Sequence, residues 1–428
     1  YRLVSFNGAR YDLPILSLAL AGARCADLKA ASDSIIKNNL QPWQVEKLYA
    51  FTMAKPDHVD LIEVAPGIAS LKIYGGRLHC RRMQDLPIEP DASIAPADRA
   101  SLREYNANDL ATTAELYASL TPQIELRAAM SDEYGLDLRS KSDAQIAEAV
   151  IKTRVATLTG YAVERPEVPA GATFRYRVPK FIGFSTPAMR GTLAMIERAR
   201  FTVPDSGKVI MPKELADAKI SIGESVYRMG IGGLHSSEKS VAHRADDDTV
   251  LIDRDVASYY PAIILNLGLA PSHMGAAFIA TYRTLVERRL AAKHAGDKVT
   301  ADALKITING SFGKFGSKWS TLFSPTLLIQ VTLTGQLSLL MLIEMLEAAG
   351  IPVVSANTDG IVIKCPENRI NACEAIIAAW ELSTGFDTEA TEYAALYSRD
   401  VNNYVAIKRA GGYKLKGAYA PAGLQKNP

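Results

Sequence analysis

The chain has 428 residues, of which 48% are hydrophobic and 22% are charged, as is typical of a globular protein with two or three domains. Its formal net charge of +2 does not indicate a nucleic-acid partner, so any such partner would have to bind local basic patches. The cysteines form no C-x-x-C pair and the histidines no H-x-x-x-H motif, which disfavours a zinc site or a disulfide framework. No apolar run is long enough to span a bilayer, so we expect no membrane association.

The first part of the chain predicts a short strand that runs into Asn7-Gly8, followed by a helix with Asp12 in its first turn. A second helix is predicted over Ser101 to Leu120. In this helix Tyr105 and Asp109 are four positions apart and therefore lie on one face. A tyrosine beside a carboxylate can orient a metal-bound water, although such a pair is commonplace when taken alone.

Residues 121–235 give the weakest pattern. A helix is predicted over Ser142 to Val155, and the prolines and glycines that follow it indicate a connector. The segment ends on Met229-Gly-Ile-Gly-Gly-Leu-His235, which contains Gly232 and Gly233. These glycines indicate either a close approach of another backbone, such as a nucleic-acid strand, or a plain tight turn.

The stretch from Val250 to Pro261 is the most informative part of the sequence. An apolar run, Val250-Leu251-Ile252, predicts a buried strand that ends at Asp253 and Asp255. Ser258 then opens a helix that reaches Leu267. A carboxylate at a strand end, next to the N–H groups of a helix N-terminus, suits a divalent metal that carries a phosphate. A capped strand–helix junction without a ligand is the alternative for this pattern alone.

Three further helices are predicted over residues 277–295, 300–312 and 327–349. The first carries Arg289 and Lys293 four positions apart, and the second carries Lys305 and Asn309 at the same spacing. Cations placed in this way either grip a polyphosphate or form a solvated helix face.

Two hairpins are predicted in the last third of the chain. In the first, β-branched runs flank the turn Asn357-Thr358-Asp359-Gly360 and set Asp359 at a tip that can lie beside the Asp255 strand. The second joins residues 401–407 to 413–418 and should gather a local basic patch of Lys408, Arg409, Lys414 and Lys416.

Five motifs therefore follow one another: N-x-x-x-Y-D, Y-x-x-x-D, D-x-x-S-Y-Y-P, K-x-x-x-N-G-S-F-G and N-T-D-G. In this order and spacing they resemble a phage-like family B DNA polymerase with a proofreading 3′–5′ exonuclease domain. The resemblance implies an α/β and α+β multidomain fold, in which a ribonuclease H-like exonuclease domain precedes a right-hand palm and fingers. The implied boundaries are 1–125 for the exonuclease, 126–235 for a connector, 236–276 and 321–400 for the palm, 277–320 for the fingers, and 401–428 for the palm–thumb junction.

The resemblance also implies roles for single residues. Asp255, Val256 and Asp359 would hold two Mg²⁺ or Mn²⁺ ions, while Asp12 and Asp109 would bind metal in the exonuclease and Tyr105 would orient its water. Tyr260 would lie under the sugar and exclude ribonucleotides, and Lys305 would contact the triphosphate of the dNTP. The implied nucleotide-binding set is Ser258, Tyr259, Tyr260, Arg289, Lys293, Lys305 and Asn309, and the implied DNA-binding set is Gly232, Gly233, Asn357, Thr358, Tyr404, Lys414 and Lys416.

The chain departs from the family pattern in several places. Asn357 and Gly360 stand where the hairpin usually has Asp and Ser, and Asn402-Asn403-Tyr404 stands for a Lys-Arg-Tyr pattern. The first exonuclease motif is expected before residue 1, and most of a thumb after Pro421, so the sequence resembles a fragment. These departures leave a degenerate, non-catalytic nucleic-acid-binding protein as the alternative function. A reverse transcriptase or an RNA polymerase is disfavoured by Tyr260 and by the exonuclease motifs.

The expected partners are primer–template DNA and dNTPs, bound by a monomer in the cytoplasm, which is the host cytoplasm if the protein is phage-encoded. The intervals between Asp255, Lys305 and Asn357 hold the predicted helices and little else. We therefore expect no added subdomain for protein priming or strand displacement. The enzyme should extend an ordinary primer and rely on a separate helicase or processivity factor.

Overall fold

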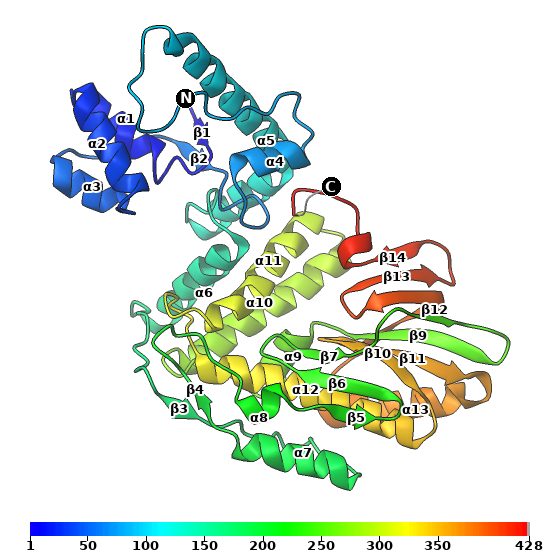
Figure 1. Ribbon diagram of the computed structural model, residues 1–428. Coiled ribbons are helices and arrows are strands. Elements are labelled where there is room, and N and C mark those ends of the chain that lie inside the picture. Colours follow the sequence, from blue (N-terminus) through cyan, green and yellow to red (C-terminus); the bar gives the residue numbers. More distant parts are fainter. Residues whose placement is uncertain (426–428) are drawn as a thin grey trace. The chain divides into compact units, whose positions relative to one another are not determined.

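The structure, a computed structural model, describes residues 1–425, so the last three residues of the predicted palm–thumb junction lie outside the described residues. The chain divides into two compact units (Figure 1). The first comprises Tyr1–Ile146 with the described residues from Ala422 onward, and the second comprises Ala147–Pro421.

The first unit is built on a two-stranded parallel sheet of β1 (Leu3–Ser5) and β2 (His58–Asp60). The predicted first helix is confirmed as α1 (Asp12–Leu20), and it packs on two helices that were not predicted, α2 (Cys25–Ile36) and α3 (Pro42–Tyr49). The core of this group consists of Leu18, Ala31, Ile35 and Val45.

A second core of this unit lies between the sheet and two helices, α4 (Leu71–Arg77) and α5 (Asp98–Tyr134). Helix α5 confirms the helix predicted from Ser101 but continues past Leu120 with Pro122 inside it. A proline inside a helix costs roughly 3 kcal/mol, which the buried stripe of Leu116, Leu120 and Ile124 offsets.

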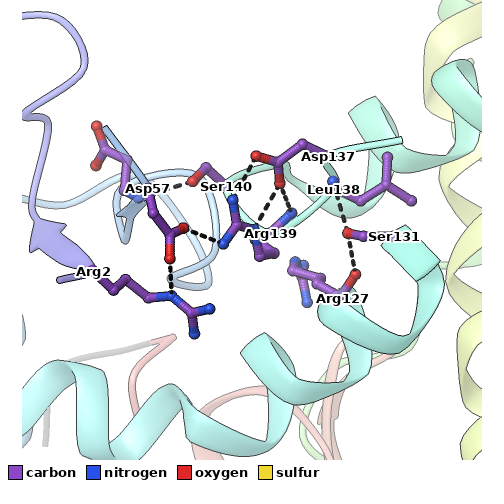
Figure 2. Close-up of polar contacts among 9 residues, drawn as sticks. Arg2, Asp57, Arg127, Ser131, Asp137, Leu138, Arg139 and Ser140 are labelled. Atoms are coloured by element: carbon purple, nitrogen blue, oxygen red, sulfur yellow. Dashed lines mark hydrogen bonds and ion pairs between the residues drawn. The ribbon is translucent and has the colours of Figure 1, made fainter. Parts of the chain in front are cut away.

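Polar contacts tie the strand ends to the segment that follows α5 (Figure 2). Asp57 accepts from Arg2 and Arg139, and Arg139 also pairs with Asp137. Ser131 links the same segment to α5, since its hydroxyl accepts from the backbone N–H of Leu138 at 2.9 Å. These contacts fix the strand pair, of which β1 leads into α1 and its first residue, Asp12.

The second unit is organised around one antiparallel sheet in the order β14-β13-β12-β9-β11-β10-β7-β6-β5, with β8 paired to β12. The strands that were predicted are confirmed as β9 (Thr249–Val256), the hairpin of β10 (Val353–Asn357) and β11 (Gly360–Pro366), and the hairpin of β13 (Asn403–Lys408) and β14 (Tyr413–Leu415). The strands that were not predicted are β5 (Ile220–Ile222), β6 (Ser225–Met229), β7 (Leu234–Ser236), β8 (Val241–Arg244) and β12 (Thr388–Asp400).

One face of this sheet is covered by α12 (Pro325–Ala348) and α13 (Ile370–Thr384), beside α9 (Tyr259–Asn266) (Figure 1). Because side chains alternate along a strand, Arg254 points to this face and pairs with Glu374 of α13, while Asp253 and Asp255 point to the other face. Helix α12 is long and apolar enough to cross a membrane, but 89% of its most apolar window is buried inside the protein, as expected of a core helix.

Two long helices, α10 (Gly275–Ala295) and α11 (Lys298–Phe315), form an antiparallel pair, in which α10 contacts α9 and α11 contacts α12. Gly296 ends α10 with a φ of 71°, and the Asp297 side chain caps α11 by accepting from the N–H of Thr300 at 3.1 Å. The predicted helix pair is therefore confirmed.

The remaining elements are α6 (Asp143–Thr159), the strand pair β3 (Thr173–Phe174) and β4 (Phe201–Thr202), α7 (Pro187–Arg198), α8 (Lys213–Ala216), and the 3₁₀ turns Glu367–Arg369 and Gly417–Tyr419.

Candidate active site

Asp255 and Asp359 lie side by side where the two central strands of the sheet meet. Gly360 is the direct partner of Asp255 in the β9–β11 ladder, and the backbone N–H of Val256 donates to the carbonyl oxygen of Asp359 at 2.7 Å. Both carboxylates line one cavity of about 250 Å³ on the face of the sheet that is turned away from α13. Burial, and then the negative charge of Asp253, raise the pKa of Asp255, and the charge of Asp359 adds to this effect.

Asp253 lies on the same face of β9, two residues before Asp255, and is 6% exposed. The hydroxyl of Tyr393, from β12, donates to its carboxylate. The ammonium of Lys414, from β14, donates to Asp253 at 3.0 Å and to Asp255 at 3.4 Å. Burial alone would lower the pKa of Lys414, but the two carboxylates outweigh it and raise that pKa, so the ammonium remains charged.

The residues at this cavity fit a divalent cation that is shared with a substrate phosphate. Lys414 supplies one positive charge to Asp253 and Asp255 together, so the two carboxylates are not fully neutralised. Among residues 1–425, no three His, Cys, Asp or Glu side chains gather into a group able to hold a metal by themselves. Mg²⁺ is usually held by one or two carboxylates, with water and substrate phosphates as its other ligands. Asp255 and Asp359, with the carbonyl of Val256 beside them, are suited to that mode of binding.

A second cavity of about 440 Å³ adjoins the first, because Asp359 lines both. Its walls come from α9, α10 and α11, and include Tyr260, Arg289, Asn309 and Phe312. The Tyr260 ring lies 4.4 Å from the Phe312 ring, between centroids, and its hydroxyl donates to the carbonyl of Gly232 at 2.9 Å. The ring is therefore held in a fixed position beside the carboxylates.

The residues predicted to bind nucleotide differ in their placement. Tyr259 lines the second cavity, but its hydroxyl donates to the Gly335 carbonyl at 2.6 Å, so its main contact is with the core helix α12. Ser258 connects β9 to α9 with a φ of 49°, a conformation that is uncommon for a non-glycine residue. Its hydroxyl accepts from the guanidinium of Arg289 at 3.3 Å.

The three predicted cations are not gathered at one point. Arg289 lines the second cavity. Lys293 is exposed and lies 3.9 Å from Glu389, which is the direct partner of Asp255 in the β12–β9 ladder. Lys305 is exposed on α11 and is not among the residues that line the cavity. In this arrangement only Arg289 among the three is directed at the space beside the carboxylates.

The glycine-rich segment before β7 accommodates another part of the same chain. A Cβ at Gly233 would come within 3.0 Å of the Cα of Thr358, which lies at the tip of the β10–β11 hairpin. The N–H of Thr358 also donates to the carbonyl of Leu234 at 2.9 Å. The backbone that approaches Gly233 is therefore the hairpin turn, whereas Gly232 is open to solvent.

Asn357 occupies a position that an aspartate could not fill with the same contacts. Its amide nitrogen donates to the carbonyl of Val401 at 3.2 Å, and its amide oxygen accepts from the hydroxyl of Thr358 at 3.1 Å. A carboxylate has no N–H to donate, and its negative charge would lie against the partly negative carbonyl oxygen of Val401. This local contact gives a physical reason for the asparagine.

The basic patch predicted on the second hairpin is divided in the structure. Lys414 is turned to Asp253 and Asp255, while Arg409 lies 3.5 Å from Glu392. Lys416 lies over the Tyr404 ring, 5.8 Å from its centroid. Lys414 and Lys416 nevertheless line the same acidic cavity, so two of the four predicted cations share one site.

The predicted exonuclease residues lie in the first unit, in two groups. Partial burial and then the charge of Asp60 raise the pKa of Asp12, with His58 opposing. Asp60 accepts from the N–H groups of Asn7 at 2.7 Å and Ala9 at 2.9 Å.

Tyr105 belongs to the other group. Burial and then Asp109 raise the pKa of Tyr105, and Lys72 lies 5.6 Å from the centroid of its ring. Among residues 1–425, Asp12 and Asp109 do not belong to a group of three or more acidic, histidine or cysteine side chains able to hold a metal.

Sequence reasoning assigned no role to Asp253 and missed Tyr393. The two-residue period of a strand places Asp253 and Asp255 on one face, so this signal was present in the sequence. Tyr393 had no comparable signal, because its contact with Asp253 depends on the pairing of β12 with β9, across 140 positions.

Comparison with solved structures gave matches of fold. No protein-family model and no curated protein matches the chain. The chain is similar to the solved structure of the family B DNA polymerase from the hyperthermophilic archaeon Pyrobaculum calidifontis, with 17% sequence identity and a TM-score of 0.45. The match covers 97% of this chain and 52% of that one, so the chain spans about half the length of the protein it resembles.

Proposed function

We propose that the chain is a template-directed DNA polymerase of family B, which adds dNTPs to a primer 3′-OH by two-metal phosphoryl transfer. The observation that carries the proposal is the position of Asp359. Its neighbour Gly360 pairs with Asp255, and Asp359 lines both the acidic cavity and the aromatic cavity that contains Arg289. Phosphoryl transfer requires carboxylates at the reacting phosphate and a cationic cradle for the rest of the triphosphate.

Two side chains of the second cavity then have roles toward the dNTP. Tyr260 would stack under the sugar, where its fixed ring leaves no room for a 2′-OH. Arg289 would bind phosphate oxygens with its planar fork of donors. Lys305 and Lys293 would join it on a movement of α10 and α11 toward the palm sheet, such as lid-like elements make around substrates.

The metal chemistry is confined to the acidic cavity. Mg²⁺ or Mn²⁺, when bound, would lower the pKa of the primer hydroxyl and offset the charge that develops on the pyrophosphate. The chain contributes Asp255 and Asp359, which would orient the ions toward the α-phosphate. Lys414 and Lys416 would hold the primer strand, and Tyr404 would support them.

The first unit would be the proofreading exonuclease of the proposal. Asp12 and Asp60 flank the loop between β1 and α1, and Tyr105 and Asp109 supply a tyrosine–carboxylate pair on α5. A degenerate, non-catalytic nucleic-acid-binding protein is the second candidate. It is favoured by the Lys414 ammonium, which already neutralises part of the acidic cavity, and by Asn357.

A primer-extension assay separates the two candidates. The purified chain is given a 5′-labelled primer on a longer template, with dNTPs and either Mg²⁺, Mn²⁺ or EDTA. The proposal requires extension that depends on the metal and copies the template. Tight binding of the primer–template with no extension under any metal would favour the non-catalytic binding protein.

A further inference from the structure

Asp253 has no role in the function proposed above, yet it is the most deeply buried carboxylate of the acidic cavity. Its side chain is 8% exposed, whereas the side chain of Asp255 is 51% exposed. A buried carboxylate is stable only when it is paired and hydrogen-bonded. Asp253 meets this condition through Tyr393, which donates a hydroxyl, and through Lys414, whose ammonium lies 3.0 Å away.

Lys414 reaches this carboxylate from a distant part of the sheet. It belongs to β14, which is separated from β9 by β13 and β12 in the strand order. A lysine side chain is a flexible four-carbon stem that takes up one direction only when its ammonium is anchored. The nearer anchor is Asp253 at 3.0 Å, and Asp255 at 3.4 Å is the more distant one.

The number of N–H groups on the ammonium sets how many acceptors Lys414 can contact at once. An ammonium has three N–H donors, of which Asp253 and Asp255 accept two. The hydroxyl of Tyr404, which lines the same cavity, also takes part in a hydrogen bond with this ammonium. Because Asp253 supplies the closer contact, Asp255 contacts the ammonium only through Oδ2, which leaves Oδ1 for a metal.

We propose that Asp253 is a positioning residue, which together with Tyr393 holds the Lys414 ammonium at the edge of the acidic cavity, where a primer strand would contact it. The inference rests on the proposed polymerase function, because it assumes a primer strand in this cavity. Asp253 itself touches neither primer nor nucleotide. Its effect on the reaction passes through Lys414.

The test is a double-mutant cycle on primer–template affinity, measured without metal. The full chain is prepared as the wild type, Asp253→Asn, Lys414→Met and the double variant. Binding of a fluorescent primer–template is measured by anisotropy in EDTA, so that the readout does not depend on turnover. Asparagine keeps the size of the side chain but removes the charge that attracts Lys414.

We expect each single substitution to weaken binding by about tenfold, the effect of one charge-assisted hydrogen bond. The double variant should bind as weakly as Lys414→Met alone, because Asp253 acts only through Lys414. In turnover assays, kcat should fall in Asp253→Asn while the KM for dNTP stays unchanged. An ion pair with a merely structural role would lower the melting temperature and leave the primer–template affinity of the folded protein unchanged.

Two further variants keep the test decisive. Tyr393→Phe removes one hydrogen bond from Asp253 and should weaken binding in the same direction by a smaller factor, even if Asp253→Asn fails to fold. Glu374→Gln breaks the ion pair of Arg254 on the opposite face of β9 and should bind like the wild type.

The inference is overturned if Asp253→Asn and Tyr393→Phe bind like the wild type, or if the losses in the double variant multiply. A wild-type chain that binds no primer–template would instead overturn the proposed function, and the inference with it.

Discussion

Gly360 lies directly opposite Asp255 in the β9–β11 ladder, and no larger residue fits there. A Cβ at position 360 would overlap Oδ1 of Asp255 and lie 2.9 Å from the carbonyl oxygen of Arg254. The glycine at the hairpin therefore keeps the Asp255 carboxylate where it lies, beside Asp359.

Gly360→Ala should lower kcat by about 10²-fold, because the added methyl group displaces the Asp255 carboxylate and small displacements at a reacting centre have effects of this size. Single-turnover primer extension measures the loss. Gly191→Ala, at an open position on α7, is the matched control and should leave the rate unchanged. A Gly360→Ala enzyme that retains the wild-type rate would show that the position of Asp255 does not limit the reaction.

Tyr260→Val should raise the incorporation of ribonucleotides relative to dNTPs by about 10- to 200-fold, the range over which a change of pocket size alters selectivity. The ring that packs on Phe312 would be lost, and with it the steric exclusion of a 2′-OH. Tyr260→Phe is the control, since it keeps the ring and loses only the hydrogen bond to Gly232. Competition between rATP and dATP measures the ratio, and unchanged sugar selectivity in Tyr260→Val would count against this role.

Arg289→Ala should raise the KM for dNTP, lower kcat or both, with a total loss of about 1–3 kcal/mol in transition-state stabilisation. Lys305→Ala and Lys293→Ala should have effects in the same direction if these side chains move to the triphosphate. Arg283→Ala, exposed on the same helix α10 and absent from the cavity lining, should behave as the wild type. Wild-type steady-state kinetics in Arg289→Ala would remove that residue from the site.

Asp255→Asn should raise the melting temperature of the metal-free protein at neutral pH. Burial and Asp253 raise the pKa of Asp255 in the folded state, so its ionised form opposes folding above the ordinary aspartate pKa. The gain should shrink as pH falls through the raised pKa, because wild-type Asp255 is then protonated as well. Thermal unfolding in EDTA across this pH range measures the difference, and a loss of stability at neutral pH would contradict this assignment.

Asp12→Ala and Asp109→Ala should reduce any 3′–5′ degradation of single-stranded DNA by at least about tenfold and leave primer extension unchanged. The substitutions lie in the first unit, whereas the polymerase carboxylates lie in the second. A 3′-recessed substrate labelled at its 5′ end reports both activities in one gel. If primer extension in these variants fell as much as degradation, the assignment of the two activities to separate units would be contradicted.

The parts of the site that were predictable from sequence are those set by local chemistry. The strand that ends at Asp255, the helix that follows Ser258, and the hairpin around Asp359 all depend on short patterns of β-branched, turn and capping residues. The spacing of Arg289 and Lys305 likewise placed them on two helices, since the pair is joined by a strong capping signal at Gly296 and Asp297.

The contacts that were not predictable depend on strand order. Lys414 meets Asp253 across 161 positions, and the register that brings them together is set by β12 and β13. Strand β12 gave no clear alternation, because its pairing with β13 shifts register between Tyr393 and Ala395 and again between Ser398 and Asp400. The surroundings of Lys305 were not predicted either. Residue spacing shows which side chains share one face of a helix, but it does not show what that face packs against.

The most direct test of the account is single-turnover extension of a labelled primer by the wild type, Asp255→Asn and Asp359→Asn, with Mg²⁺ and a saturating concentration of the correct dNTP. The account predicts template-directed extension by the wild type and a rate lower by about 10³-fold or more in each variant, with primer–template binding retained. Extension by either variant at a rate close to that of the wild type, or no extension by a wild-type chain that binds primer–template, would contradict it.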